Sequence, residues 1–119
     1  MKCSTILLAA LALLGAAPAA AQTDYAAQLT EGDVVLRDFR FRSGETMAEL
    51  RLHYATLGTP RRDARGRIAN AVMVLHGTGG SGRQFLQPQF AQELYGPGQP
   101  LDLSRYYVIL PDNIGHGRS

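Results

Sequence analysis

The sequence predicts an α/β protein, and two patterns carry this prediction. Two segments in which apolar and polar residues alternate flank a short glycine-containing turn, which predicts an antiparallel hairpin. A continuously apolar run then precedes a glycine-rich stretch, a segment of helical spacing and a second apolar run. This order is typical of a parallel strand–helix–strand unit with a right-handed crossover. The expected sheet therefore contains a hairpin followed by a βαβ unit.

The hairpin is predicted over residues 34–42 and 49–57, with the turn at residues 43–45. The period-two pattern of the second strand leaves His53 facing outward, where we expect it to be solvated. The inward face of that strand is predicted to hold Leu50, Leu52 and Tyr54. The next stretch, residues 58–67, carries four arginines and one acidic residue, and we interpret it as a solvated loop.

The βαβ unit begins with the strand predicted at residues 71–75, whose unbroken apolar character is typical of a strand buried on both faces. Residues 84–95 have helical spacing, and the regular helix is expected to start near Pro88 because proline is tolerated only in a first turn. The glycines and prolines of residues 96–100 end it. A last strand follows at residues 106–110.

The first residues predict a secretory signal peptide. Lys2 is followed by an apolar run at residues 6–14 and by small residues up to Ala21. The run is shorter than the roughly 20 apolar residues that span a bilayer. The sequence therefore predicts a leader at 1–21, a lead-in at 22–33 and one domain at 34–119, in a protein that is exported to the periplasm or secreted.

Composition excludes several function classes. Beyond the leader the chain has 11 Arg against 10 Asp and Glu, which gives no electrostatic reason to expect nucleic acid or, after leader cleavage, a membrane as partner. The only cysteine, Cys3, lies in the leader, so a disulfide, a thiolate ligand and a cysteine nucleophile are excluded from the rest. The three histidines are far apart in sequence without a carboxylate cluster, and no metal or cofactor is expected.

The glycine-rich stretch at residues 76–82 is the most informative segment. It has four glycines in seven residues and lies between a buried strand and a helix. Such a loop leaves backbone N–H groups free to approach an anion at the carboxyl edge of the sheet, where ligands of open α/β sheets bind. Three kinds of site compete for it.

The first is a dinucleotide site, since Gly77, Gly79 and Gly82 satisfy G-x-G-x-x-G in the required context. The acidic residue that should follow the next strand is not well placed, because Asp102 lies beside a proline and Asp112 is 30 residues past Gly82. The second is a P-loop, which is excluded because Arg83 and Gln84 replace the Lys and Ser/Thr.

The third is an oxyanion hole of the kind found in α/β-hydrolases, which take one oxyanion donor from the loop after the third strand, often within a His-Gly sequence. His76 and Gly77 end the third strand here and would support the loop. The N–H groups of Thr78 and Gly79 are then the candidate oxyanion donors. The preceding hairpin and the D-x-x-G-x-G-x-S pattern at residues 112–119 also favour this third interpretation.

These segments together resemble the amino-terminal part of an α/β-hydrolase, in the branch that contains homoserine O-acetyltransferase. The resemblance covers nearly all of residues 34–119. It is carried by residues 41–45, 52–58, 70–77, 95–98, 101–102 and 105–109, which read FRSGE, LHYATLG, NAVMVLHG, YGPG, LD and RYYVI. The stretch at residues 78–81 departs from the acyltransferase pattern.

The resemblance implies a Ser nucleophile, an acidic residue and a His, in that order, all beyond Ser119. No G-x-S-x-G occurs in the chain, and His76 and His116 are interpreted as loop-structuring residues because the catalytic His comes last in this fold. The expected fold is therefore an incomplete α/β-hydrolase sheet that is inactive by itself. Its apolar edge at residues 71–75 predicts poor solubility.

The leading hypothesis for the parent protein is an exported serine hydrolase that acts on a small-molecule ester or acyl substrate through an acyl-enzyme. The alternatives are an O-acyltransferase of the homoserine acetyltransferase type, disfavoured by the leader because acetyl-CoA is cytosolic, and a dinucleotide-binding module.

Overall fold

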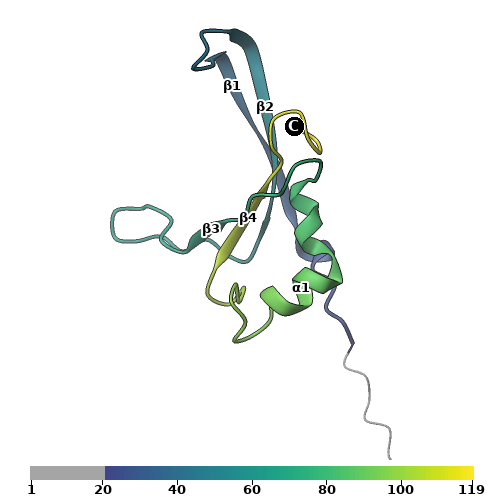
Figure 1. The fold of residues 1–119 in the computed structure, drawn as a ribbon. Coiled ribbons are helices and arrows are strands. Elements are labelled where there is room, and N and C mark those ends of the chain that lie inside the picture. Colours follow the sequence, from purple (N-terminus) through teal and green to yellow (C-terminus); the bar gives the residue numbers. More distant parts are fainter. Residues whose placement is uncertain (1–20) are drawn as a thin grey trace, which may run out of the picture.

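The computed structural model describes residues 21–119, and their fold is a four-stranded mixed sheet with helices against one face (Figure 1). The strands are β1 (Thr30–Arg40), β2 (Thr46–Leu57), β3 (Ala71–Met73) and β4 (Tyr107–Pro111). The helices are the 3₁₀ turns η1 (Ala26–Gln28) and η2 (Gly82–Leu86) and the α-helix α1 (Pro88–Leu94). The leader predicted at residues 1–21 lies outside the described residues, apart from Ala21.

The strand order is β1-β2-β4-β3, so β4 lies between two strands that precede it in sequence. β1 and β2 form the predicted antiparallel hairpin, and β4 adds antiparallel to the last four residues of β2. β3 and β4 are parallel, which confirms the βαβ unit. The fold class predicted from the sequence, an amino-terminal portion of an α/β sheet with a hairpin first, is therefore present.

Several predicted boundaries differ from the structure. β1 begins at Thr30, inside the predicted lead-in, because it pairs with the whole length of β2 back to Thr56. β3 ends at Met73, two residues early, although the Val74 N–H still donates to the Ile109 carbonyl at 2.9 Å. The helix starts at Pro88, as predicted, with proline at its first position.

The core lies between the sheet and α1. Side chains from the ends of β2 and β4 meet Ala91 and Tyr95 of the helix region and Tyr25 of the lead-in. The Tyr25 and Tyr95 rings are 5.3 Å apart in an edge-to-face contact, so the lead-in is fixed to the core. Burial raises the pKa of the Tyr95 phenol to about 12. The sheet residues of this core are Ala55, Leu57, Val108 and Leu110.

His53 corrects the sequence-based assignment of faces in β2. It shares its face with Ala55 and Leu57 and is only 5% exposed, whereas it was predicted to be solvated. Leu52 and Tyr54 lie on the opposite face, where they line a mostly apolar groove of about 370 Å³ with Ile109. The alternation assigned Leu52 and Tyr54 to the core. At this end of β2, however, their face of the sheet is the one without helices (Figure 1).

The edge formed by β3 is apolar and exposed. Met73 and Leu75 are 60% and 61% exposed, so the run predicted to be buried on both faces is largely uncovered in this chain. The arginine-rich loop at residues 58–67 projects away from the sheet and is exposed, as predicted (Figure 1). Gly58 must be glycine because it has φ +77° and a Cβ there would overlap the Tyr106 carbonyl. No helix among residues 21–119 is long and apolar enough to cross a membrane.

Candidate functional site

The glycine loop, residues 76–82, leaves the carboxyl end of β3 and leads into η2. Its centre is a type II turn: the Gly80 N–H donates to the Gly77 carbonyl at 3.1 Å, and Gly79 has φ +80°. Thr78 and Gly79 form the exposed corner of this turn. Within the described part of the chain their N–H groups donate no hydrogen bond, so both remain available to an external acceptor.

His76 fixes the start of the glycine loop. Its ring is 5% exposed, and Nε2 accepts a hydrogen bond from the Asn113 N–H at 2.9 Å. Because a backbone N–H can only donate, Nε2 is unprotonated and the proton lies on Nδ1, which donates to the Gly77 carbonyl at 2.8 Å. The imidazole is therefore neutral and fully engaged, and it packs edge-to-face on His116 with ring centroids 5.5 Å apart.

Asp112 fixes the end of the same loop. One carboxylate oxygen accepts the Gly82 N–H at 2.8 Å and the other accepts the Arg118 N–H at 2.7 Å. Burial of Asp112 opposes ionisation, but these two N–H groups outweigh it, so the pKa of the carboxyl lies below its ordinary value of 3.8. The carboxylate thus ties the loop after β3 to the loop after β4.

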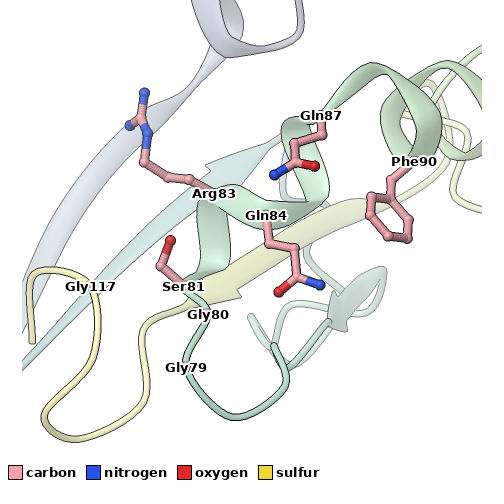
Figure 2. Close-up of a pocket in the computed structure, with 8 residues that line it drawn as sticks. All are labelled: Gly79, Gly80, Ser81, Arg83, Gln84, Gln87, Phe90 and Gly117. Carbon is pink, nitrogen blue, oxygen red and sulfur yellow. The ribbon is translucent and has the colours of Figure 1, made fainter.

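A pocket of about 570 Å³ opens beside the corner of the glycine loop (Figure 2). Gln84 reaches toward Gly79 and Gly80, whereas the Arg83 side chain extends toward β1 (Figure 2). The pocket is lined by Gly79, Gly80, Ser81, Arg83, Gln84, Gln87, Phe90 and Gly117. Apart from Arg83, the lining therefore consists of uncharged amides, small residues and one aromatic ring, and it includes Gly79 of the turn.

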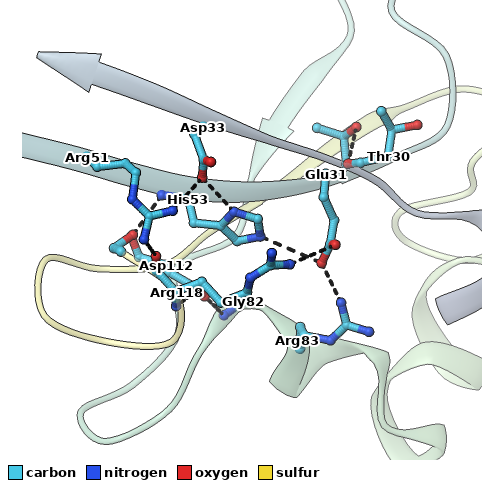
Figure 3. Close-up of polar contacts among 11 residues, drawn as sticks. Thr30, Glu31, Asp33, Arg51, His53, Gly82, Arg83, Asp112 and Arg118 are labelled. Atoms are coloured by element: carbon cyan, nitrogen blue, oxygen red, sulfur yellow. Dashed lines mark hydrogen bonds and ion pairs between the residues drawn. The ribbon is translucent and has the colours of Figure 1, made fainter.

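A charged cluster joins the hairpin to both loops (Figure 3). Glu31 of β1 accepts Arg83 at 2.5 Å and Arg118 at 3.0 Å. His53 lies beneath, with Nε2 3.6 Å from Glu31 and Nδ1 2.8 Å from Asp33. Sequence reasoning missed this cluster because β1 was predicted to begin after both carboxylates. The signal present in the sequence was the acidic pair at residues 31 and 33, directly before the strand predicted at residues 34–42.

The other polar residues considered from the sequence have structural partners. The Ser119 hydroxyl accepts the His53 N–H at 2.8 Å and donates to the Asp112 carbonyl at 3.1 Å. Asp102 precedes β4, at the opposite end of that strand from the glycine loop, and its two oxygens accept the N–H groups of Gly98 and Ser104 at 2.8 Å. It is therefore not free to hold a ribose. Across residues 21–119 no group of three His, Cys, Asp or Glu residues could hold a metal ion.

Known proteins similar to this chain are enzymes of acyl chemistry. No protein-family profile matches it. Homoserine O-acetyltransferase of Leifsonia xyli is 34% identical over 86 residues, which cover 65% of this chain and 20% of that protein. Homoserine O-acetyltransferase of Geotalea daltonii is 35% identical over 85 residues, with coverages of 66% and 22%. Homoserine O-succinyltransferase of Hydrogenovibrio crunogenus is 32% identical, with coverages of 63% and 20%.

Solved structures show the same fold. Homoserine O-acetyltransferase from Bacillus anthracis superimposes with a TM-score of 0.57 at 23% identity, covering 71% of this chain and 23% of that one. Esterase E22 gives 0.56 at 22% identity, with coverages of 71% and 24%. The chain has the amino-terminal part of an α/β-hydrolase fold, of the homoserine O-acetyltransferase-like branch. It spans about a fifth of the length of the curated relatives it matches.

Proposed function

We propose that this α/β-hydrolase segment supplies the oxyanion-binding loop of a longer enzyme that transfers an acyl group to a hydroxyl. One observation carries the proposal: Thr78 and Gly79 present unpaired N–H groups at the carboxyl end of β3, beside a pocket of about 570 Å³. Preorganised donors of this kind stabilise the negative charge that develops on a carbonyl oxygen during acyl transfer.

The chemistry divides between this chain and the residues that would follow it. In the longer protein a Ser oxygen attacks the acyl carbonyl carbon, and a His takes its proton. The N–H groups of Thr78 and Gly79 hold the resulting oxyanion. The thiol or alcohol leaving group departs with the proton, and the acceptor hydroxyl then attacks the acyl-enzyme and regenerates the Ser. The 119-residue chain has no G-x-S-x-G nucleophile of its own, so we expect it to be inactive alone.

Transfer is favoured over hydrolysis by the relatives. The similar curated proteins quoted above carry names of homoserine O-acyltransferases, with acetyl or succinyl as the acyl group. A small-molecule amino acid hydroxyl is therefore the preferred acceptor. The leading hypothesis from the sequence, an exported serine hydrolase, is kept as the second candidate because the apolar run at residues 6–14 favours export and because an esterase shares the fold.

A pair of assays on the product of the extended reading frame separates the two candidates. Transfer predicts CoA release from acetyl-CoA that depends on added homoserine, whereas hydrolysis predicts turnover of p-nitrophenyl acetate that needs no acceptor. In the 119-residue chain alone neither activity is expected. Stable esterase activity of that short chain, abolished by a serine-directed reagent, would contradict the proposal that the nucleophile lies beyond Ser119.

The oxyanion assignment is tested by removing one N–H group. Proline suits the second position of a type II turn, so Thr78→Pro deletes the donor and keeps the turn. We expect kcat to fall about 10²–10³-fold with little change in KM. The matched variant Thr78→Ala keeps the N–H and should retain activity. Equal kcat values in the two variants would refute a role for the Thr78 N–H.

A further inference from the structure

Two consecutive residues at the end of β4 hold both ends of the glycine loop. The Asn113 N–H donates to His76 Nε2 at the start of the loop, and Asp112 Oδ1 accepts the Gly82 N–H at its end. Only residues 77–81 lie between these anchors. The turn that carries the two free N–H groups is therefore held at both ends by the same short segment, Asp112 and Asn113.

We propose that Asp112 is the positioning residue of the oxyanion loop: its carboxylate, by binding the Gly82 N–H, sets the direction of the Thr78 and Gly79 N–H groups. This inference rests on the proposed function for what those N–H groups bind. The positioning itself is a structural statement that can fail independently.

Asp112 is buried, and the backbone packs closely around its carboxylate. The residue is 6% exposed, and its second oxygen accepts the Arg118 N–H. Gly117 leaves no room for a side chain, because a Cβ there would overlap the carboxylate. A Cβ on Gly82 would in turn overlap the Leu110 carbonyl, so the loop approaches β4 as closely as backbone permits.

The anchor is itself attached to the hairpin. The Asp112 N–H donates to the His53 carbonyl at 2.9 Å, and Arg51 of the same strand donates to the Arg118 carbonyl at 2.5 Å. Glu31 then binds Arg118 and Arg83 together. Through Asp112, the glycine loop is thus attached to β2, the longest strand of the sheet.

Two isosteric substitutions test the proposal in the ¹⁵N-labelled 119-residue chain, which also carries Met73→Lys to make the exposed β3 edge polar and so limit self-association. Asp112→Asn replaces one acceptor oxygen by an NH₂ group that faces an N–H donor. Asp102→Asn is the matched control, because Asp102 is also 6% exposed and also accepts two backbone N–H groups, but it lies at the other end of β4.

The amide signals of the glycine loop provide the readout. In Asp112→Asn we expect the Thr78 and Gly79 signals to move and hydrogen exchange at Gly82 to rise about tenfold or more, since hydrogen bonds to charged groups are the stronger ones. In Asp102→Asn these signals should stay in place, whatever the loss of global stability. Movement of the Thr78 and Gly79 signals to the same extent in both variants would overturn the proposal.

A glycine pair tests the same point with the charge of Asp112 retained. Gly117→Ala pushes a Cβ into the carboxylate, whereas Gly115→Ala meets nothing within 4 Å, although both positions have positive φ. We expect only Gly117→Ala to move the Thr78 and Gly79 signals. Unchanged signals in folded Gly117→Ala would contradict the proposal.

The Met73→Lys chain, labelled with ¹³C as well as ¹⁵N, offers a measurement that needs no further substitution. As the pH is lowered, the Gly82 and Arg118 amide signals should move with the Asp112 side-chain carboxyl ¹³C signal, and Thr78 and Gly79 should follow with the same midpoint. If the Thr78 and Gly79 signals did not change as the Asp112 carboxyl titrates, the positioning role would be overturned. If positioning holds while Thr78→Pro leaves kcat unchanged in the longer protein, the proposed function fails and the positioning stands.

Discussion

His53 Nδ1 lies 2.8 Å from the Asp33 carboxylate, and the two residues are directly opposite each other in the β1–β2 ladder. The His53 side chain is only 7% exposed, whereas that of Asp33 is 42% exposed. The pair therefore connects the buried face of the hairpin to its solvated rim. Cross-strand pairs of this kind contribute to hairpin stability through local contact.

Removing the imidazole should loosen the hairpin. We expect His53→Leu, which roughly keeps the volume, to lower the free energy of unfolding by about 1 kcal/mol, because it deletes one hydrogen bond to a carboxylate that water can partly replace. The shift in urea midpoint at constant slope measures this change. His116→Leu is the control, since the half-buried His116 ring packs on His76 without a hydrogen bond among the described residues. An equal shift in both variants would argue against the His53–Asp33 pair.

Acid should destabilise the chain through Asp112. Its pKa is lowered in the folded state, so its stabilising contribution is full above the unfolded pKa of about 4 and is lost as the pH falls through the folded value. The gap in urea midpoint between wild type and Asp112→Asn should thus be constant between pH 5 and 7 and close below about pH 4. If the two urea midpoints still differed at low pH, the lower stability of Asp112→Asn would come from altered packing and not from the lost carboxylate charge.

The close approach at Gly58 should be costly to fill. Gly58 and Gly66 have nearly the same φ, +77° and +76°, but only at Gly58 would a Cβ overlap the backbone of Tyr106. Gly66→Ala should lower the free energy of unfolding by about 1 kcal/mol, from backbone strain alone. Gly58→Ala should cost about 1–3 kcal/mol more, because β2 and the start of β4 must separate. Thermal or urea unfolding of both variants checks the difference.

The exposed edge of β3 should drive self-association. Met73 is 60% exposed on an edge strand, and an unpaired apolar edge is a template for pairing with another chain. We expect Met73→Lys to lower light scattering and sedimentation-detected association, whereas Met47→Lys, at 40% exposure on the far part of the hairpin, should change little. A wild-type chain that stays monomeric over the concentration range in which Met73→Lys is compared with it would contradict this prediction.

The alternation of apolar and polar residues predicted where the strands lie, but it did not predict which face is covered. His53, Ala55 and Leu57 form one face of β2, and Leu52 and Tyr54 form the other. Both faces carry apolar residues, so period two alone could not choose between them. The helices decide the matter, and their placement depends on the crossover from β3 to β4.

The glycine loop could be predicted because glycine, strand and helix signals coincide within residues 71–95. Its anchors could not be, since Asp112 is 30 residues from its partner Gly82 and no local pattern indicates such a contact. The D-x-x-G-x-G-x-S pattern marked residues 112–119 as a loop of interest, but only the sheet order brings that loop beside the first one.

The strand order has a consequence for how the chain is synthesised and folded. The hairpin of β1 and β2 is local and can form as soon as residue 57 is available. β3, however, contacts the rest of the sheet only through β4, which is the last of the four strands in sequence. Until residues 107–111 have been made, one edge of β2 is open, β3 has no partner strand, and α1 lacks the Val108 and Leu110 side chains of its core. The five residues of β4 therefore convert a free hairpin and a tethered apolar segment into one cooperative unit.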